Sequence, residues 1–395
     1  MKKIMIIGSG PWQIHLINKA KAMGLFVINT NLYENSDGFP YADVGIPIDI
    51  YDKEGHLEIA KRYGVHGVTT DQIDIAVPTA AYVCEKLGLP GIGIDMGELF
   101  TNKIRMREFC KAHGILQPRF ECCRSFEEAA SAALTIGFPV IIKPTNNRSS
   151  RGVHKISNRD ELAIKLPNTM ACSREPSFLV EEYIGGFELS VEGFKTRKKH
   201  TSLAVSTKEQ FGHNTVLDSR VFYPKDKSSF NYEKLKDIQD GLVNASGLPF
   251  GITHAEFKCW NDKFYVVEFA ARGGGANISS HIIPMISGVD VNELLLRMAM
   301  GADIADVKPA KQDKAVVLEF FSLREGKVKS IHGFEKIQAM KNVVDAALSF
   351  KVGDVLTLST DGGNRAGHFI AFAENDERLN TLCETIRKTL VVEYE

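Results

Sequence analysis

The first 95 residues alternate continuous apolar stretches with helical patterns, and this alternation constrains the fold more than any other feature. The apolar stretches are KKIMIIGSG, LFVINTN, VGIPIDI and VHGVTTD, and the helical ones are QIHLINKAKAMG, HLEIAKRYG and IAVPTAAYVCEKLG. Strands that are apolar throughout and are joined by crossover helices are typical of a parallel sheet with both faces covered. We therefore expect a doubly wound, Rossmann-like α/β domain over residues 1–95.

The first strand ends in Gly8-Ser9-Gly10, which invites comparison with the dinucleotide-binding fingerprint. That fingerprint needs a third glycine and an acidic residue about 20 positions further on. Here the third position is Gln13, and the second strand ends in Asn29-Thr30-Asn31. We therefore expect a tight turn beside a binding crevice, and no nicotinamide or flavin cofactor.

The composition is ordinary for a soluble globular protein, and the length predicts two or three domains. The chain has 395 residues, 44% hydrophobic and 25% charged, with a formal net charge of −1. This balance gives no reason to expect nucleic acid or an anionic membrane as a partner. The start, MKKIMIIGSGPW, is too short in apolar residues for a secretory signal and predicts a first strand. Seven scattered cysteines without a C-x-x-C pair predict reduced thiols and a cytoplasmic protein.

Residues 101–156 combine two predicted helices with a basic loop. Thr101 is the expected N-cap of the first helix, and Ser125 with Glu128 forms a capping box for the second. Lys143 then ends the apolar strand in FPVIIKP and precedes the polar loop 146–152. A lysine on a rigid strand end beside a Ser/Gly loop suits polyphosphate. A solvated surface hairpin is the alternative, and the P-loop motif is absent.

The stretch SFLVEEYIGGFELSVEGF predicts a strand, a glycine turn and a second strand. An extended segment at Glu181-Glu182-Tyr183-Ile184 could offer its backbone N–H and C=O groups to an adenine ring. Glu188, after the turn, could accept hydrogen bonds from two ribose hydroxyls. By itself, the pattern is also that of a hairpin with acidic residues.

The stretch HAEFKCWNDKFYVVEFAARGGG predicts a hairpin that carries one glutamate on each strand. If Glu256 and Glu268 pair directly, the loop holds an odd number of residues, 261–263. Period two then puts Phe264 and Val266 on the face of the two glutamates. Opposed carboxylates need a cation between them, and Mg²⁺ with oxygen ligands fits. With a two-residue turn the glutamates would face opposite sides, and a solvated hairpin face is the alternative.

Arg272 follows the second glutamate at the strand exit, before three glycines. An arginine there can hold a transferring phosphoryl group or a substrate carboxylate at two points. Glycines at 273–275 let the backbone approach a ligand closely.

Taken in order, these features resemble the ATP-grasp superfamily, and the resemblance covers nearly the whole chain. It implies that ATP lies between two α+β lobes, with Lys103 and Lys143 on its α- and β-phosphates. It further implies that a loop closes over the phosphates, that a strand-edge segment binds adenine and that Glu188 binds ribose. The loop residues are Ser149, Ser150, Arg151 and Gly152; the adenine residues are Glu181, Glu182, Tyr183 and Ile184. Glu256 and Glu268 would hold Mg²⁺ or Mn²⁺, and Arg272 and Lys143 would be catalytic.

Within the superfamily, the chain is similar to the L-amino-acid (dipeptide) ligases. The motif often written E-x-N-x-R reads Glu268-Phe269-Ala270-Ala271-Arg272 here, so an asparagine ligand is replaced by Ala270. LPGIG, NKIRMREFCKAHGI and the tail from FFSLREGKVKSIHG onward also resemble that branch. The implied architecture is a pre-ATP-grasp domain (1–95), an ATP-grasp core (96–308) with a mobile lid lobe near 118–185, and a small C-terminal α+β domain (309–395).

The implied reaction joins a small-molecule carboxylate to an amine through an acyl phosphate, with release of ADP and phosphate. The alternatives are an ATP-dependent carboxylase, a carbamoyl-phosphate-synthetase-like enzyme, a phosphotransferase to a hydroxyl, and a non-catalytic ATP-binding protein. A general base is not evident: His213, His254 and His281 fall near the predicted site, and packing or solvent histidines are the alternative. Residues 207–220 are expected to line the acceptor pocket. Relatives are commonly dimers, so a homodimer is one expected assembly.

Overall fold

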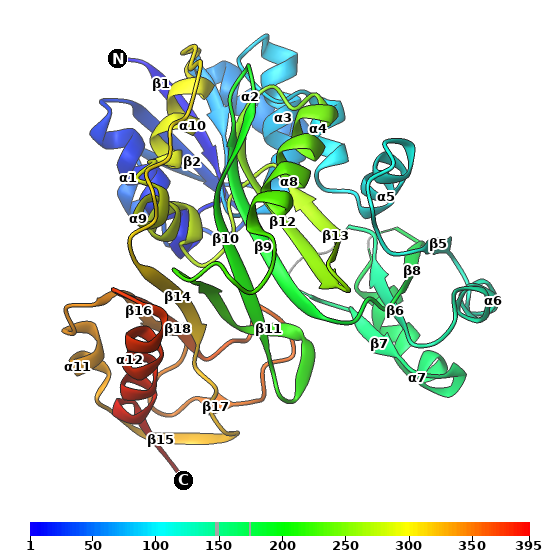
Figure 1. The fold of residues 1–395 in the computed structure, drawn as a ribbon. Helices are drawn as coiled ribbons and strands as arrows, with labels where there is room; N and C mark the ends of the chain where they lie inside the picture. Colours follow the sequence, from blue (N-terminus) through cyan, green and yellow to red (C-terminus); the bar gives the residue numbers. More distant parts are fainter. Residues whose placement is uncertain (147–149, 174) are drawn as a thin grey trace.

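The computed structural model describes residues 1–146, 150–173 and 175–395. The strands of these described residues form four sheets (Figure 1). The largest sheet runs through the middle of the molecule. In Figure 1 the blue N-terminal layer and the red C-terminal end lie on one side of it, and the small lid sheet lies on the other. Among the described residues, no helix is long and apolar enough to cross a membrane.

The N-terminal sheet is parallel throughout, with the order β3-β2-β1-β4, as the sequence predicts. Ile4, Met5, Ile6 and Ile7 of β1 have no exposed surface, because helices cover both faces. The strands are β1 (Lys3–Ile7), β2 (Phe26–Asn31), β3 (Val44–Pro47) and β4 (Gly67–Thr69). The helices are η1 (Pro11–Gln13), α1 (Ile14–Ala22), η2 (Phe39–Tyr41), α2 (Lys53–Tyr63), η3 (Asp74–Ala76), α3 (Val77–Leu87) and α4 (Ile94–Leu99).

The central sheet is antiparallel and has eight strands in the order β13-β12-β9-β10-β11-β14-β18-β16. Its strands are β9 (Phe187–Lys195), β10 (His200–Phe211), β11 (Asn214–Tyr223), β12 (Gly251–Trp260), β13 (Lys263–Ala270), β14 (Ala315–Phe320), β16 (Val343–Leu348) and β18 (Gly367–Ala373). Three of these strands come from the predicted C-terminal domain. That region therefore continues the core sheet by backbone hydrogen bonds, and the boundaries at residues 95 and 308 stay predictions.

The lid lobe is a four-stranded antiparallel sheet with the order β5-β8-β6-β7, packed against two helices. Its strands are β5 (Phe120–Cys123), β6 (Val140–Pro144), β7 (His154–Ile156) and β8 (Phe178–Glu182), and its helices are α6 (Phe126–Ile136) and α7 (Arg159–Ala171). Ser125 caps α6 by accepting a hydrogen bond from the Glu128 N–H, as expected. The Glu128 carboxylate accepts from the Arg124 N–H, so this half of the box lies one residue earlier than predicted.

The remaining elements connect and cover these sheets. The helices are α5 (Lys103–Ala112), α8 (Tyr232–Ser246), the π-helical turn η4 (Ile278–Ile282), α9 (Ile283–Ser287), α10 (Val291–Ala299), α11 (Phe334–Gln338) and α12 (Asp376–Thr389). A small sheet has the order β17-β15-β19, with β15 (Gly326–His332), β17 (Val355–Leu356) and β19 (Val391–Tyr394). The predicted N-cap of α5 is wrong: Asn102, and not Thr101, accepts from the N–H groups of Ile104 and Arg105.

Candidate active site

A cavity of about 460 Å³, here called the central cavity, brings together nearly all of the predicted site residues. Its walls come from the lid sheet, from the central sheet and from the loop at 361–363. The predicted residues on its lining are Lys103, Lys143, Ser150, Glu181, Glu182, Tyr183, Ile184, Glu188, Glu256, Glu268 and Arg272. Gly152 lies on the wall of an adjoining cleft, and Ser149 lies outside the described residues. The roles assigned to these residues stay predictions.

Glu256 on β12 and Glu268 on β13 are directly paired, as expected, but the predicted loop is wrong. Trp260 pairs with Lys263, so the turn has two residues, Asn261 and Asp262, with φ of 50° and 56°. Positive φ at both positions is the geometry of a type I′ hairpin turn. A two-residue turn alone would have put the glutamates on opposite faces.

A β-bulge restores the pairing of the two glutamates. The register shifts between Glu256 and Phe257, and Phe257 pairs with Val266, which leaves Val267 as the extra residue. The extra residue returns Glu268 to the face of Glu256. The predicted neighbours are therefore wrong: Phe264 and Val266 pack in the core with Phe257 and away from the glutamates.

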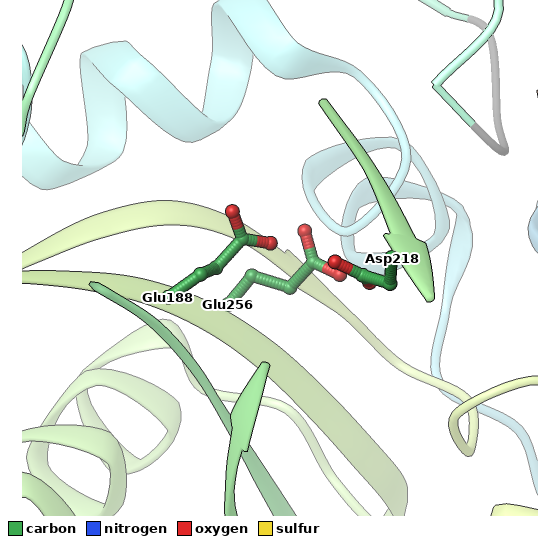
Figure 2. Close-up of side chains that lie close together, drawn as sticks. All are labelled: Glu188, Asp218 and Glu256. Atoms are coloured by element: carbon green, nitrogen blue, oxygen red, sulfur yellow. The ribbon is translucent and has the colours of Figure 1, made fainter. Parts of the chain in front are cut away.

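Lys208 joins three carboxylates at the floor of the central cavity. Its ammonium lies 2.5 Å from Glu256, 3.0 Å from Asp218 and 3.2 Å from Glu188. Figure 2 shows the three carboxylates turned toward one another. Burial alone would lower the pKa of Lys208, but the three carboxylates raise it well above its ordinary value. Lys208 and Asp218 lie in the segment 207–220, which the sequence predicts as lining of the acceptor pocket, but sequence reasoning missed their ion pairs because only the strand register puts Lys208 opposite Glu188.

Lys143 belongs to a second buried group of charges at the lid end of the cavity. Its ammonium lies 2.8 Å from Glu181, which also accepts from Arg107 Nε at 2.7 Å. Burial lowers the pKa of Lys143 to about 8 although Glu181 opposes it. Burial would raise the pKa of Glu181, but Arg107 and Lys143 hold it at about 2. The side chain of Glu181 is thus engaged by cations of this chain.

Arg107, which sequence reasoning missed, links the lid to the hairpin. Besides Glu181 on β8, it donates to the carbonyl oxygens of Val266 at 3.2 Å and Val267 at 2.7 Å. Its side chain is 1% exposed, so these bonds are made in a buried setting. The position of the bulge residue is therefore fixed by the same guanidinium that orients Glu181.

Lys103, at the start of α5, lies 3.1 Å from Glu268 and is buried, with 7% of its side chain exposed. Both predicted metal-binding glutamates are thus paired with lysines, Glu268 with Lys103 and Glu256 with Lys208. Lys258 completes this side of the cavity at 3.1 Å from Glu188. A cation could replace or join the lysines at these carboxylates, and an anion could replace the carboxylates at the lysines.

The predicted adenine segment forms the end of β8. Glu182 is held by Arg119 at 3.1 Å, and the Lys155 ammonium lies 3.9 Å from the centre of the Tyr183 ring. The N–H of Glu182 donates to Arg119 and the N–H of Tyr183 to Pro139. Ile184 is buried. These two N–H groups are therefore already used. A backbone contact to adenine would have to come from other N–H and C=O groups of residues 181–184.

The described part of the predicted phosphate loop docks onto the β10–β11 hairpin and the C-terminal region. Ser150, with φ of 58°, donates from its hydroxyl to the Val216 carbonyl at 2.8 Å. Arg151 Nε lies 3.5 Å from Asp361. A Cβ at Gly152 would come within 2.8 Å of the Cys172 side chain, and its φ of 70° suits glycine.

Arg272 is held by the N-terminal domain. Its Nε and Nη2 donate to the two oxygens of Asp74 at 2.7 and 2.9 Å. Nearby, Asp71 accepts from the Gly273 N–H at 2.8 Å and from the Asn292 amide at 3.0 Å. Sequence reasoning missed both aspartates, although both follow the carboxyl end of β4, where open parallel sheets bind ligands.

Of the three histidines considered, His254 is the one on the central cavity. Its Nδ1 lies 2.6 Å from Glu192 and its Nε2 3.4 Å from Glu256. Burial would lower the pKa of His254, but Glu192 raises it to about 9, which makes it a cation. His213 bonds the Ser359 carbonyl at 2.9 Å, and His281 contacts the His15 ring at 4.3 Å. Neither lines the central cavity.

The donor set fits a hard divalent cation. Glu188, Asp218 and Glu256 offer oxygens that all lie within 4.8 Å of one another. Glu268, the other predicted ligand, is not part of this group, although it is paired with Glu256 across the hairpin. Carboxylate oxygens in a small cavity are the ligands that Mg²⁺ prefers. Ala270 adds no ligand. Besides the glutamates of the hairpin, the protein oxygens available to a cation are those of Glu188 on β9 and Asp218 on β11.

Comparison with known proteins agrees with this geometry. Residues 136–280 match the ATP-grasp domain family, and residues 319–395 match the family described as L-amino acid ligase C-terminal domain 2. The chain is 26% identical over 286 residues to alanine–anticapsin ligase of Bacillus subtilis, covering 65% of this chain and 59% of that protein. It is 23% identical over 325 residues to a carbamoyl phosphate synthase large chain of Clostridium botulinum, covering 78% and 30%.

Among solved structures, an L-amino acid ligase from Bacillus licheniformis superposes with a TM-score of 0.87 at 20% identity, over 100% of this chain and 99% of that one. The fold and the two domain matches show what the chain contains: an ATP-grasp domain within residues 136–280 and, over residues 319–395, the C-terminal domain of the L-amino acid ligases. The chain spans 59% and 30% of the two curated relatives, so their activities are matters of proposal for this chain.

Proposed function

We propose that this protein is an ATP-dependent carboxylate–amine ligase that forms an amide or peptide bond through an acyl phosphate. The observation that carries the proposal is the paired Glu256 and Glu268 with Arg272 four residues beyond, all on one cavity that also holds Lys103 and Lys143. This arrangement combines hard anionic ligands with three cations around a space of about 460 Å³. Such a site suits a polyphosphate and a reacting carboxylate together.

The two lysines and the arginine have distinct positions. Lys143 ends a buried strand of the lid and Lys103 begins α5, so both ammonium groups are held by rigid elements. We infer that both ammonium groups neutralise phosphate oxygens when the nucleotide is bound. The phosphates would then replace the carboxylates that the two lysines contact in the free protein. Mg²⁺, when bound by Glu256 and Glu268, would supply charge neutralisation to the phosphates.

Arg272 is the group best located for the reacting carboxylate. Its guanidinium is oriented by Asp74, and it lies beside a glycine loop whose backbone Asp71 holds. A fixed guanidinium can stabilise the negative charge that develops on the transferring phosphoryl group and on the acyl phosphate. Catalysis of this kind needs positioning and charge and no nucleophilic side chain.

The chemistry balances in two steps. An oxygen of the substrate carboxylate attacks the γ-phosphorus of ATP, the bond to the β-phosphate oxygen breaks, and ADP leaves. A neutral amine then attacks the acyl carbon, loses a proton, and expels inorganic phosphate with the electrons of the C–O bond. His254 is already a cation at neutral pH, so it is poorly suited to take that proton.

The C-terminal region favours the amide-forming reaction over the alternatives. Residues 319–395 match the L-amino acid ligase C-terminal domain, and β18 of that region pairs with β14, which in turn pairs with β11 at the cavity wall. A carboxylase would need a bicarbonate site, and a non-catalytic binder would have no need of the buried pairs at Arg272 and Lys208. The homodimer and the cytoplasmic location stay predictions.

Release of ADP and phosphate from Mg-ATP, across a matrix of amino acids singly and in pairs, tests this function. Glu268→Gln is the control, because it removes one carboxylate charge from the hairpin pair. Turnover that needs a carboxylate and an amine, and is lost in the control, supports the ligase. Turnover that needs bicarbonate contradicts it, and so does binding of ATP without turnover when neither amino acids nor peptides serve as the amine.

A further inference from the structure

A second and larger cavity adjoins the central cavity, and a reaction between two small amino acids gives it no occupant. This cavity, the outer cleft, has a volume of about 1590 Å³. Sites for drug-sized molecules have volumes of about 300–1,000 Å³. A single small amino acid would therefore fill only a small part of it.

The outer cleft is continuous with the central cavity. Both are lined by Trp12, Gln72, Ser150, Arg151, Val153, Thr215, Val216 and Asp361. Trp12 is at the junction and packs on the glycine loop: a Cβ on Gly275 would lie 3.3 Å from its ring. Gly275 is three residues beyond Arg272, so the cleft opens at the proposed reacting end. A molecule with one end at Arg272 could extend past Trp12 into it.

One side of the outer cleft, here called the N-terminal wall, presents large side chains to solvent. It consists of Leu32, Tyr33 and Tyr51, with exposures of 49%, 69% and 37%. These residues follow the carboxyl ends of β2 and β3, where open parallel sheets bind ligands. Exposed aromatic and aliphatic groups along a cavity favour a ligand with apolar or aromatic parts.

The opposite side, here called the lid wall, is basic. It carries Arg151, His154, Lys155 and Lys165, and the described residues of this wall include no carboxylate. Lys155 is held over the Tyr183 ring at 3.9 Å, and Lys165 donates to the Lys155 carbonyl at 3.2 Å. Asp361, across the cleft, pairs with Arg151, and Glu161 lies 3.7 Å from Lys165, so Lys155 supplies the positive charge that no carboxylate among the described residues of this wall balances. This wall favours an anionic group at a distance from the reacting end.

We propose that the amine substrate is an extended, anionic, peptide-like molecule longer than one amino acid. This inference rests on the proposed ligase function and names the class of its second substrate. The free amine lies by the glycine loop, the chain passes Trp12, and apolar side chains rest on the N-terminal wall. Carboxylates at the far end, a C-terminus or acidic side chains, face Lys155 and Lys165.

Binding is tested directly by the fluorescence of Trp12. The chain has two tryptophans, and Trp260 is at the hairpin turn, so Trp260→Phe leaves Trp12 as the single reporter. In this background, with Mg-ADP present, an alanyl-phenylalanyl-glutamate tripeptide is titrated against free alanine. The tripeptide is expected to change the emission at concentrations at least tenfold lower than alanine. An emission that responds equally to both, or to neither, contradicts the proposal.

Turnover supplies the second test, with the carboxylate substrate identified in the amino-acid matrix. Lys165→Glu and Tyr33→Ala are each expected to raise KM for the tripeptide about fivefold, the size of one ion pair or ring contact. Lys388→Glu and Tyr41→Ala are the matched controls, since both residues are exposed and neither is among the described lining residues of the central cavity or the outer cleft. They are expected to leave KM as it was.

The outcomes separate the two proposals. If free amino acids are consumed and the tripeptide is not, the ligase function stands and the extended acceptor is wrong. If the wall variants behave as their controls do, the extended acceptor is also wrong. If no amine of either length supports ADP release while Mg-ATP still binds by calorimetry, the ligase function itself fails and the inference falls with it.

Discussion

Arg272 of the central hairpin and Asp74 of the N-terminal domain form a two-point ion pair across 198 residues of sequence. The Nε–Oδ1 distance is 2.7 Å and the Nη2–Oδ2 distance is 2.9 Å. Although burial would raise the pKa of Asp74, Arg272 holds it below its ordinary value, so the pair is charged. Two parallel bonds fix the plane of the guanidinium, which a single bond would not. The N-terminal domain therefore sets the direction in which Arg272 points.

Replacing Asp74 by asparagine is expected to reduce kcat while leaving KM for ATP nearly unchanged. The amide keeps the size of the side chain but loses the charge and one acceptor, so Arg272 is no longer held at two points. A misplacement of this kind can reduce the rate about 100-fold. Steady-state kinetics with saturating substrates measures it, and Asp74→Glu should restore part of kcat. Asp95→Asn is the control, since Asp95 is an exposed partner of Arg105 at 3.7 Å. Wild-type kcat in Asp74→Asn would contradict the positioning role.

Replacing Lys208 by methionine is expected to destabilise the protein and to make its stability depend on Mg²⁺. The change leaves Glu188, Asp218 and Glu256 close together without their shared cation. Breaking a buried ion pair by removing one partner costs about 3–5 kcal/mol. Because Mg²⁺ can bind the three carboxylates, it should raise Tm more in this variant than in the wild type. Thermal unfolding without nucleotide, with and without Mg²⁺, measures both effects.

Lys258→Met is the matched control for that comparison. Lys258 contacts Glu188 alone among these carboxylates, at 3.1 Å, and its side chain is 19% exposed. Replacing Lys258 should therefore lower Tm less than replacing Lys208 does, and Mg²⁺ should raise Tm by a smaller amount. An equal response in the two variants would mean that the three-carboxylate group has no special affinity for the cation.

The sequence predicted the fold and the cavity residues well because both depend on local patterns. The apolar strands of the first 95 residues and Lys143 at a strand end are such patterns. Asp74, Lys208 and Arg107 could not be found in this way. Lys208 meets Glu188 through the register of β9 and β10, and Asp74 meets Arg272 across two domains. Their surroundings in the sequence carry no mark of these contacts.

In the hairpin, the pairing of Glu256 with Glu268 was predicted correctly because a shorter turn and a β-bulge compensate for each other. The predicted pairing of Glu256 and Glu268 is confirmed, whereas the three-residue loop that led to it is wrong. The turn is one residue shorter than predicted, and the bulge at Val267 adds one residue to β13. Nothing local in FYVVEF announces a bulge, because its support is tertiary: Arg107 donates to the carbonyls of Val266 and Val267.

The type I′ turn predicts a stabilising substitution. Asp262 has φ of 56°, and glycine takes this conformation without the steric cost that other residues meet. Asp262→Gly is therefore expected to raise the free energy of unfolding by about 0.5–1 kcal/mol, without changing kcat. Urea unfolding measures the change. Asp313→Gly is the control, because Asp313 is exposed and is not among the residues with positive φ. It should not raise the free energy of unfolding. A lower urea midpoint for Asp262→Gly would show that the aspartate makes a favourable contact in the turn.

The buried position of Lys143 predicts that nucleotide binding takes up a proton in mildly alkaline solution. In the free protein, burial lowers the pKa of Lys143 from 10.5 to about 8, so the side chain loses its proton as the pH rises through that value. Phosphate oxygens beside the ammonium would raise the pKa again. Between the two pKa values the complex holds a proton that the free protein lacks, so ATP affinity falls as the pH rises above about 8. Calorimetry in two buffers with different ionisation enthalpies should detect uptake at about pH 9 and none at about pH 6.

Lys143→Arg separates this lysine from other groups that titrate in the same range. Arginine stays protonated at both pH values, so the uptake assigned to Lys143 should disappear in this variant, even if the longer guanidinium weakens binding. Proton uptake that persists at about pH 9 in Lys143→Arg would assign the titration to another residue, and the lowered pKa would then have no part in nucleotide binding.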